Sequence, residues 1–279
     1  MAGSSSGQRL ALCWGSVEGG DLFDLAQAAA RAGIVAIAVT PRHYLDQARI
    51  GLSDAQIRRR LGDLGVRVAL IDPLIAPMPG IPPLSAIAEP MRWLFEPDQA
   101  DCWRAAAALE AEAINLTHFL GGPVEEAAIG ERMARLAATN RAEGFATMIE
   151  FIPGTGVPDL ITAARLTRDV ADLSIMFDCW HYARSGGALD HIAALPPDAI
   201  GGVQINDWAP PEPGQPYVPM TGRLMPGDGV LPLAQILARI EANSPGLWVG
   251  IEVFNADLSA MPRDRAVERM AERAARLIA

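Results

Sequence analysis

The hydrophobic pattern of this chain is repetitive. From residue 9 onward, short apolar runs alternate with longer stretches rich in Ala, Leu, Arg and Glu. Short apolar runs of this kind are typical of parallel strands, and the longer stretches are typical of the helices that connect them. The pattern predicts eight strands, at residues 9–14, 34–40, 66–72, 113–119, 145–151, 173–179, 200–206 and 248–254. It predicts a helix after each strand, near residues 21–32, 53–64, 90–111, 124–143, 159–171, 188–194, 231–242 and 262–278.

Turn signals mark the points where a helix must end and the next strand begin. These signals are Gly33, Gly65, Gly144 and the pair Pro196-Pro197. An open doubly wound sheet is the alternative, but it usually has a Gly-rich phosphate turn after its first strand, where this chain has an acidic segment at 18–21. We therefore expect a single-domain α/β fold, a (β/α)8 TIM barrel over residues 9–279, preceded by a flexible N-terminal tail at residues 1–8.

Two of the predicted loops are long and rich in proline. They follow the third and seventh strands, at residues 71–83 and 208–220, whereas the loops that follow helices are short. In a TIM barrel, the loops after the strands form the mouth of the active site. The sequence therefore places the functional site at the C-terminal ends of the strands.

The composition excludes several classes of function. The chain has 279 residues and a net charge of −10, and all 23 of its basic residues are Arg. The acidic balance argues against binding to nucleic acid or to a membrane, and the absence of Lys excludes Schiff-base chemistry. No phosphate-binding G-x-x-x-x-G-K-[ST] motif is present.

The cysteines and the hydropathy pattern indicate the cellular compartment in which the protein is expected. Cys13, Cys102 and Cys179 are too widely spaced for a disulfide framework or a C-x-x-C metal knuckle, which fits a reducing cytoplasm. The first residues lack the features of a signal peptide, and no apolar run reaches the ~18 residues that a membrane span requires. We expect a cytoplasmic protein, and the sequence leaves open whether it forms a homo-oligomer.

Four predicted strands carry a carboxylate or an amide near their C-terminal ends. Glu150, Asp178, Gln204 and Glu252 each follow an inward-facing position by two residues, so strand alternation points all four side chains into the barrel. Acidic groups buried together are costly unless they are paired, hydrogen-bonded or bound to a cation. An all-oxygen set favours one divalent metal ion, Mn²⁺ or Mg²⁺, with Co²⁺ and Zn²⁺ as alternatives.

At these positions the sequence resembles the xylose isomerase-like TIM barrel family of sugar isomerases and epimerases. The most specific segments are D-x-W-H at 178–181, V-Q-I-N-D at 203–207, R-L-M-P-G-D-G at 223–229 and G-I-E-V-F at 250–254. The resemblance covers nearly the whole barrel and implies that Glu150, Asp178, Gln204 and Glu252 are the metal ligands. Many relatives have His where this chain has Gln204, and a Gln occurs there in related dehydratases that act on dehydroshikimate.

The resemblance also implies roles for residues around the metal. Glu150 and Glu252 resemble the pair that removes and returns a proton, His181 resembles a histidine that contacts substrate oxygen, and Arg223 resembles an arginine that pairs with substrate oxygens. From its position at the end of the fourth strand, His118 is a further candidate for substrate binding, although a satisfied core histidine is an equal alternative. Trp14 and Trp180 offer aromatic faces to a ring-shaped substrate, although each is equally suited to the core.

The predicted function is that of an enzyme with a small-molecule polyol or hydroxy-ketone substrate. We expect a divalent-metal-dependent isomerase or epimerase that transfers a proton next to a carbonyl through an enediolate. One alternative is a metal-dependent dehydratase, a lyase of the dehydroshikimate or keto-inositol type, and another is a catalytically inactive ligand-binding barrel. The AP-endonuclease branch of the superfamily, which holds several metals with many histidines, is disfavoured because this chain has only four His residues.

Overall fold

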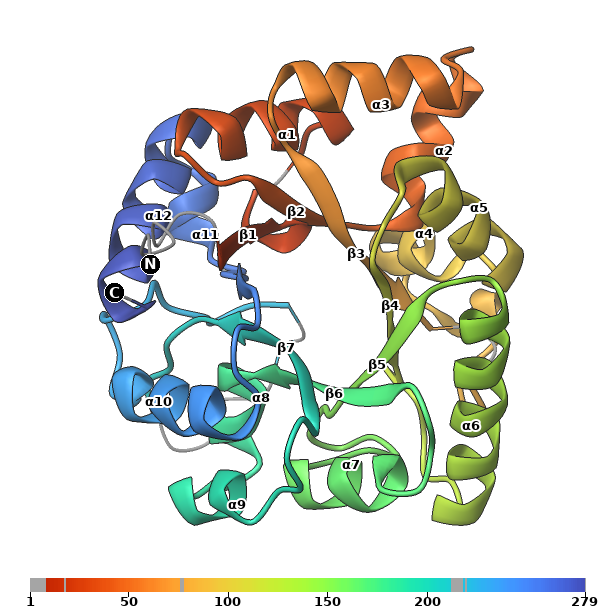
Figure 1. Ribbon diagram of the computed structural model, residues 1–279, viewed down its shortest axis with the longest axis vertical. Helices are drawn as coiled ribbons and strands as arrows, with labels where there is room; N and C mark the ends of the chain where they lie inside the picture. Colours follow the sequence, from red (N-terminus) through yellow and green to blue (C-terminus); the bar gives the residue numbers. More distant parts are fainter. Residues whose placement is uncertain (1–8, 18, 76–77, 212–217, 219, 279) are drawn as a thin grey trace.

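The computed structural model describes residues 9–17, 19–75, 78–211, 218 and 220–278. Its eight strands are all parallel, and they form a closed barrel in chain order because the first strand also pairs with the last. Figure 1 shows the helices arranged around the outside of the barrel. The predicted single-domain (β/α)8 fold is confirmed, whereas the predicted tail at residues 1–8 lies outside the described residues.

The strands lie close to their predicted positions. They are β1 (Leu10–Cys13), β2 (Ala36–Val39), β3 (Arg67–Leu74), β4 (Ala113–Thr117), β5 (Ala146–Glu150), β6 (Leu173–Asp178), β7 (Ile200–Ile205) and β8 (Val249–Ile251). The main helices between and after them are α1 (Leu22–Arg31), α2 (Pro41–Arg49), α3 (Asp54–Asp63), α5 (Gln99–Leu109), α6 (Glu126–Ala142), α7 (Leu160–Thr167), α9 (Leu189–Ala193), α10 (Leu233–Asn243) and α12 (Arg263–Ile278). Short helices complete the set: η2 (Trp14–Ser16), η3 (Leu84–Ala86), η4 (Glu89–Met91), α4 (Arg92–Phe95), α8 (Cys179–Arg184) and α11 (Ala256–Ser259).

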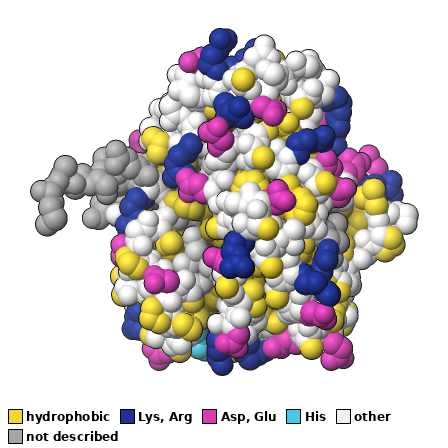
Figure 2. Space-filling view, turned by 45° about the vertical axis from the view of Figure 1, so that its right-hand side comes forward, with side chains coloured by type: hydrophobic (Ala, Val, Ile, Leu, Met, Phe, Trp, Pro, Cys, Tyr) yellow, Lys and Arg dark blue, Asp and Glu magenta, His cyan; other side chains and the backbone are white. Residues whose placement is uncertain are grey.

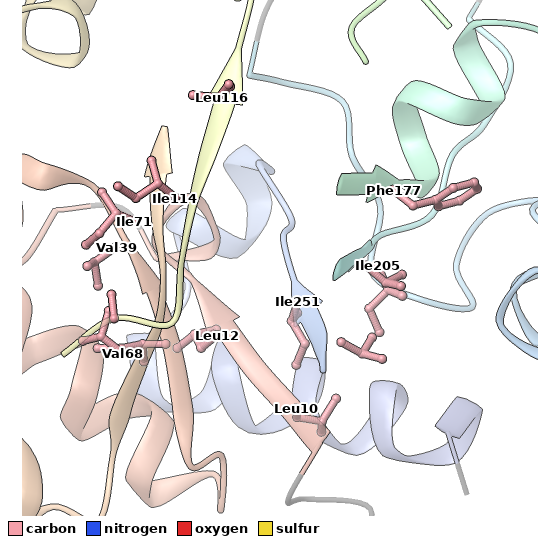
Figure 3. Close-up of a cluster of buried hydrophobic side chains, with 14 of the residues drawn as sticks. Leu10, Leu12, Val39, Val68, Ile71, Ile114, Leu116, Phe177, Ile205 and Ile251 are labelled. Atoms are coloured by element: carbon pink, nitrogen blue, oxygen red, sulfur yellow. The ribbon is translucent and has the colours of Figure 1, made fainter. Parts of the chain in front are cut away.

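Alternation along the strands divides the apolar side chains into two layers. One set faces the helices and forms the main core, which includes Leu10, Leu12, Val39, Ile114 and Ile251 (Figure 3). The intervening positions form a smaller cluster of Cys13, Ala38, Leu70, Ala113, Met148 and Met176. This smaller cluster fills the barrel interior, so the barrel is a packed core beneath its mouth and not a pore.

Three local differences from the sequence pattern have identifiable causes. The pattern does not predict α2, which begins with Pro41 in its first turn, a position that suits proline because its missing N–H is not needed there. It also misses α8, whose N-cap is Asp178. The predicted helix at 90–111 is divided into η4, α4 and α5, because Pro97 cannot continue a helix and Asp98 caps the next one by accepting from the backbone N–H of Asp101 at 2.9 Å.

The outer surface mixes charges of both signs. On the face shown in Figure 2, Arg side chains lie among Asp and Glu side chains, and no part of it is uniformly basic. Ion pairs such as Arg165 with Glu126 join neighbouring helices on the surface. No helix in the described part of the chain has both the length and the apolar character needed to cross a membrane.

The main core generates a stability prediction. Ile149, which is fully buried in β5, should cost about 2–5 kcal/mol of unfolding free energy when replaced by Ala, because the substitution leaves a cavity that the packed barrel cannot close. Ile161→Ala on α7 is the matched control, since Ile161 is 48% exposed and should change stability by less than about 0.5 kcal/mol. Urea unfolding of the two variants checks this, and equal losses would contradict the assigned core.

Candidate metal and substrate site

Polar side chains gather where the strands end. In six strands, a residue of the barrel interior is followed two positions later by a carboxylate or an amide. These polar residues are Asp72, Asn115, Glu150, Asp178, Gln204 and Glu252, and all six are buried. Because the strands are parallel and the barrel is closed, their C-terminal ends bring these side chains to one place.

Two amide side chains connect the carboxyl groups. Asn115 donates from Nδ2 to Asp72 at 2.8 Å and to Glu150 at 3.1 Å. Gln204 donates from Nε2 to Glu252 at 3.1 Å and to Asp72 at 3.4 Å. Each amide nitrogen therefore bridges two carboxyl groups, and Asp72 belongs to both bridges.

Asp178 is held by the start of helix α8. Its Oδ1 accepts from the backbone N–H of His181 at 2.8 Å, and its Oδ2 accepts from Asn206 Nδ2 at 2.9 Å. The same turn of helix places the His181 ring next to Glu150, with 3.3 Å between Nε2 and Oε1. The D-x-W-H spacing thus serves two purposes, since it caps the helix and brings the histidine to the carboxyl cluster.

Arg223 supplies positive charge to the cluster from the loop after β7. Its guanidinium lies 3.2 Å from Asp178 and 3.2 Å from Glu252. Asp207 anchors this loop, because its backbone forms a bridge with Leu224 and its carboxylate accepts from the backbone N–H of Gly227 at 2.9 Å. The V-Q-I-N-D and R-L-M-P-G-D-G segments therefore fold against each other to deliver Arg223 to the site.

Burial governs the ionisation of the cluster. It raises the pKa of Asp72 to about 6 despite the hydrogen bond from Asn115, and burial with neighbouring carboxylates raises the pKa values of Glu150 and Glu252 well above their usual range. Burial alone would raise the pKa of Asp178 as well, but Arg223 and His181 lower it below the ordinary value. Burial also lowers the pKa of His181 to about 3, so its ring is neutral near pH 7.

The donor set fits a divalent metal ion. Glu150, Asp178 and His181 can each offer a ligand atom within 4.8 Å of the others. The Oε1 atom of Gln204 is buried without a hydrogen-bond partner, because the amide nitrogen takes both carboxyl contacts, and this leaves the oxygen for a cation. Four buried carboxyl groups against one guanidinium leave an excess of negative charge that a divalent ion would offset.

Comparison with known proteins identifies the family. The model of the xylose isomerase-like TIM barrel family matches residues 26–277. The chain belongs to this family. A comparison with curated proteins found no match.

Solved structures with the same fold include three with informative descriptions. IolI, solved with a bound zinc atom, has a TM-score of 0.78 and 14% identity over 96% of each chain. A probable 3-DHS dehydratase of petrobactin synthesis from Bacillus anthracis, AsbF, has a TM-score of 0.71 and 14% identity, covering 95% of this chain and 98% of its own. D-psicose 3-epimerase, solved in the presence of D-fructose, has a TM-score of 0.65 and 16% identity over 97% of this chain and 96% of its own. These likenesses show the shared barrel fold.

In this xylose isomerase-like barrel, a small cavity of about 50 Å³ opens onto the carboxyl cluster. Its polar walls are Asp72, Thr117, Glu150, His181, Arg223 and Glu252, and its apolar walls include Trp14, Leu94, Phe119, Ile152 and Phe254. Asp178 and Gln204 are absent from these walls and lie behind them. The cavity therefore combines acid–base groups with an apolar enclosure.

Trp180 and His118, which the sequence analysis offered as substrate-binding residues, do not line the small cavity. Trp180 is buried outside the cavity walls and packs its ring under the Arg223 guanidinium at 5.1 Å. His118 does not line the cavity either. Its Nδ1 accepts a hydrogen bond from the backbone N–H of Gly156 at 2.8 Å, and its Nε2 lies 2.6 Å from the carbonyl oxygen of Pro79. These contacts favour a structural role for His118, in which its ring joins two loops.

Asp72 and Asn115 are the site residues that the sequence analysis missed. Both follow inward-facing residues, Leu70 and Ala113, by two positions, which is the same signal that identified Glu150 and Glu252. In the sequence, Asp72 falls at the start of the predicted loop at 71–83, and Asn115 falls in the middle of the predicted strand at 113–119. Neither was therefore recognised as a polar residue at the end of a strand. Their convergence on the later strands depends on barrel closure.

The raised pKa of Asp72 predicts a pH-dependent stability of the metal-free barrel. Between about pH 4 and pH 6 the unfolded chain has lost this proton while the folded protein keeps it, so the contribution of Asp72 to the free energy of unfolding should fall as pH rises, by up to about 3 kcal/mol. Glu150 and Glu252 act in the same direction as Asp72, whereas His43 and His181, whose pKa values burial lowers to about 4 and about 3, act in the opposite direction, so the contribution of Asp72 is measured as a difference between two proteins. Urea unfolding of chelator-treated wild type and of Asp72→Asn measures the two pH slopes, and the wild-type slope should be the more negative one. An unchanged slope in that variant would refute the assignment.

Proposed function

We propose that this barrel is a divalent-metal-dependent isomerase or epimerase of a sugar or related hydroxy-ketone. The observation that carries this proposal is the small cavity lined by both Glu150 and Glu252. The two carboxyl groups come from strands separated by two others around the barrel, and burial raises the pKa of each. Such a pair suits removal of a proton from a carbon next to a carbonyl and return of a proton to the same or the neighbouring carbon.

The proposed metal ligands are Glu150, Asp178, Gln204 and Glu252, with His181 adjacent to Glu150. Mn²⁺ or Mg²⁺ suits the oxygen-rich set, and Co²⁺ or Zn²⁺ remains an alternative. When bound, the ion would supply positive charge that polarises the substrate carbonyl. The family match and the structural likeness to a zinc-bound protein, IolI, support a metal in this place.

The remaining groups of the site would bind and orient the substrate. Arg223 lines the cavity and presents donors to substrate oxygens, while the Trp14 ring offers an apolar face to the C–H side of a sugar. His181 is neutral and contributes a hydrogen bond without adding charge. Leu94, Phe119, Ile152 and Phe254 exclude water from the reacting carbon, which strengthens the polar contacts inside the cavity.

The first prediction of this proposal concerns metal content and proton transfer. Protein purified without chelator should hold one divalent ion per chain by elemental analysis, and Asp178→Ala should lose it. Glu150→Gln and Glu252→Gln should retain some metal, because an amide keeps an oxygen ligand, but should lose nearly all turnover, since an amide cannot accept a proton. Wild-type rates in both Gln variants would disprove the proton-transfer roles.

The second prediction separates isomerisation from dehydration. In D₂O, an isomerase or epimerase should place deuterium in a product of otherwise unchanged formula, because the proton is removed and then returned from solvent-exchangeable groups. A dehydratase would release water and leave a conjugated carbonyl that absorbs in the near ultraviolet. Mass spectrometry of reactions with ketoses, inositol ketones and cyclic hydroxy-ketones distinguishes the two, and a water-loss product without any deuterated isomer would replace the isomerase proposal with a lyase.

A further inference from the structure

A second and larger cavity adjoins the small one. Its volume is about 680 Å³, against about 50 Å³ for the cavity at the carboxyl cluster. The two cavities share the walls formed by Trp14, Met220 and Phe254, so they lie next to each other. The larger cavity lies between segments that follow β1 and β2, together with Pro90 and Trp93 from the region after β3.

Aromatic rings form one side of this larger cavity. The rings of Trp14 and Trp93 have centroids 5.6 Å apart and planes at 88°, so together they make a corner with two differently directed apolar faces. Phe254 meets Trp14 edge to face at 5.3 Å, and both rings line both cavities. A ring with an apolar C–H face packs well against such a surface.

Hydrogen-bonding groups also line the larger cavity. His43 Nδ1 accepts from the Thr40 backbone N–H at 3.3 Å and lies 2.8 Å from Thr40 Oγ1. Burial lowers the pKa of His43 to about 4, so the ring is neutral at pH 7 and carries its proton on Nε2, as a donor. Gln47 and Asp21 also line the cavity and are hydrogen-bonded to each other at 3.2 Å.

The charges of the cavity exclude an anionic ligand. Asp21 and Asp46 line it, and its Arg42 is already paired with Asp46 at 2.8 Å and with Glu96 at 2.8 Å. A phosphate or carboxylate would therefore meet carboxylates without an uncommitted guanidinium to bind it. A neutral ring with several hydroxyl groups can donate hydrogen bonds to the carboxylates of Asp21 and Asp46 and can accept one from Nε2 of His43.

From this geometry we infer that the substrate has two parts, a reacting hydroxy-ketone in the small cavity and a second, neutral, hydroxylated ring of sugar type in the larger cavity. The first half of this inference rests on the proposed function, whereas the second half rests on the larger cavity alone. Trp93 and His43 would recognise the second ring, and neither lines the small cavity. The shared wall of Trp14 and Phe254 would lie beside the bond that joins the two parts.

Binding measurements with matched sugars test the inference. D-fructose is compared by calorimetry with its glucosylated forms turanose, maltulose and palatinose on Mn²⁺-loaded protein, and methyl α- and β-D-glucopyranoside probe the larger cavity alone by saturation-transfer NMR. We expect at least one glucosylated ketose to bind about tenfold more tightly than fructose, and a glucoside to bind detectably. Trp93→Ala and His43→Ala should remove most of that gain while leaving metal content and melting temperature near the wild-type values.

Trp103→Ala is the matched control, because Trp103 lines neither cavity and its indole is bonded instead to Asn140. This variant should keep the full preference for the two-ring ligand. The inference is overturned if no glucoside or glucosylated ketose shows binding that depends on Trp93, even when fructose exchanges deuterium with solvent. If that binding is present but no ketose exchanges deuterium or reacts, the second-ring site stands and the proposed chemistry fails.

Discussion

The structure depends on the burial of several carboxyl groups at one end of a closed barrel. Asp72, Glu150, Asp178 and Glu252 are all buried, and each would be costly to ionise there without compensation. Amide nitrogens, a helix N-terminus and the Arg223 guanidinium supply part of that compensation. The remaining negative charge supports the proposed cation site, and the raised pKa values of Glu150 and Glu252 support their proposed roles in proton transfer.

The barrel interior below the site makes this arrangement possible. Met148 and Met176 belong to the apolar cluster of the barrel interior, and Gly202 leaves room for both of them while Gly250 leaves room for Cys13. A Cβ on Gly202 would stand 2.9 Å from Met176 Cε, and a Cβ on Gly250 would stand 2.8 Å from Cys13 Sγ. Glycines therefore lie next to larger side chains in the barrel interior, and the polar side chains at the strand ends pack directly above a close-packed apolar layer.

If the proposed function and the two-part substrate hold, the two cavities divide the tasks of chemistry and recognition. The small cavity brings charged groups together in an apolar enclosure, where electrostatic contacts are strong and water is scarce. Most residues that line the larger cavity come from the segments after the first two strands, which contribute no carboxyl group to the cluster of Asp72, Glu150, Asp178 and Glu252. Under the proposed function, this separation would let the loops specify the substrate while the strand ends supply the reacting groups.

The sequence by itself determined the eight repeats and the inward direction of Glu150 and Glu252, because strand alternation and helix periodicity are local properties. Only the tertiary structure decided that Asp72 joins this cluster and that His118 bonds to backbone on both sides. Both sets of contacts depend on barrel closure and on loops from different strands that come together at the mouth. The spacing of residues along the chain does not predict such contacts. The larger cavity has the same origin, since Trp14 and Trp93 lie far apart in sequence and form a corner only in the folded protein.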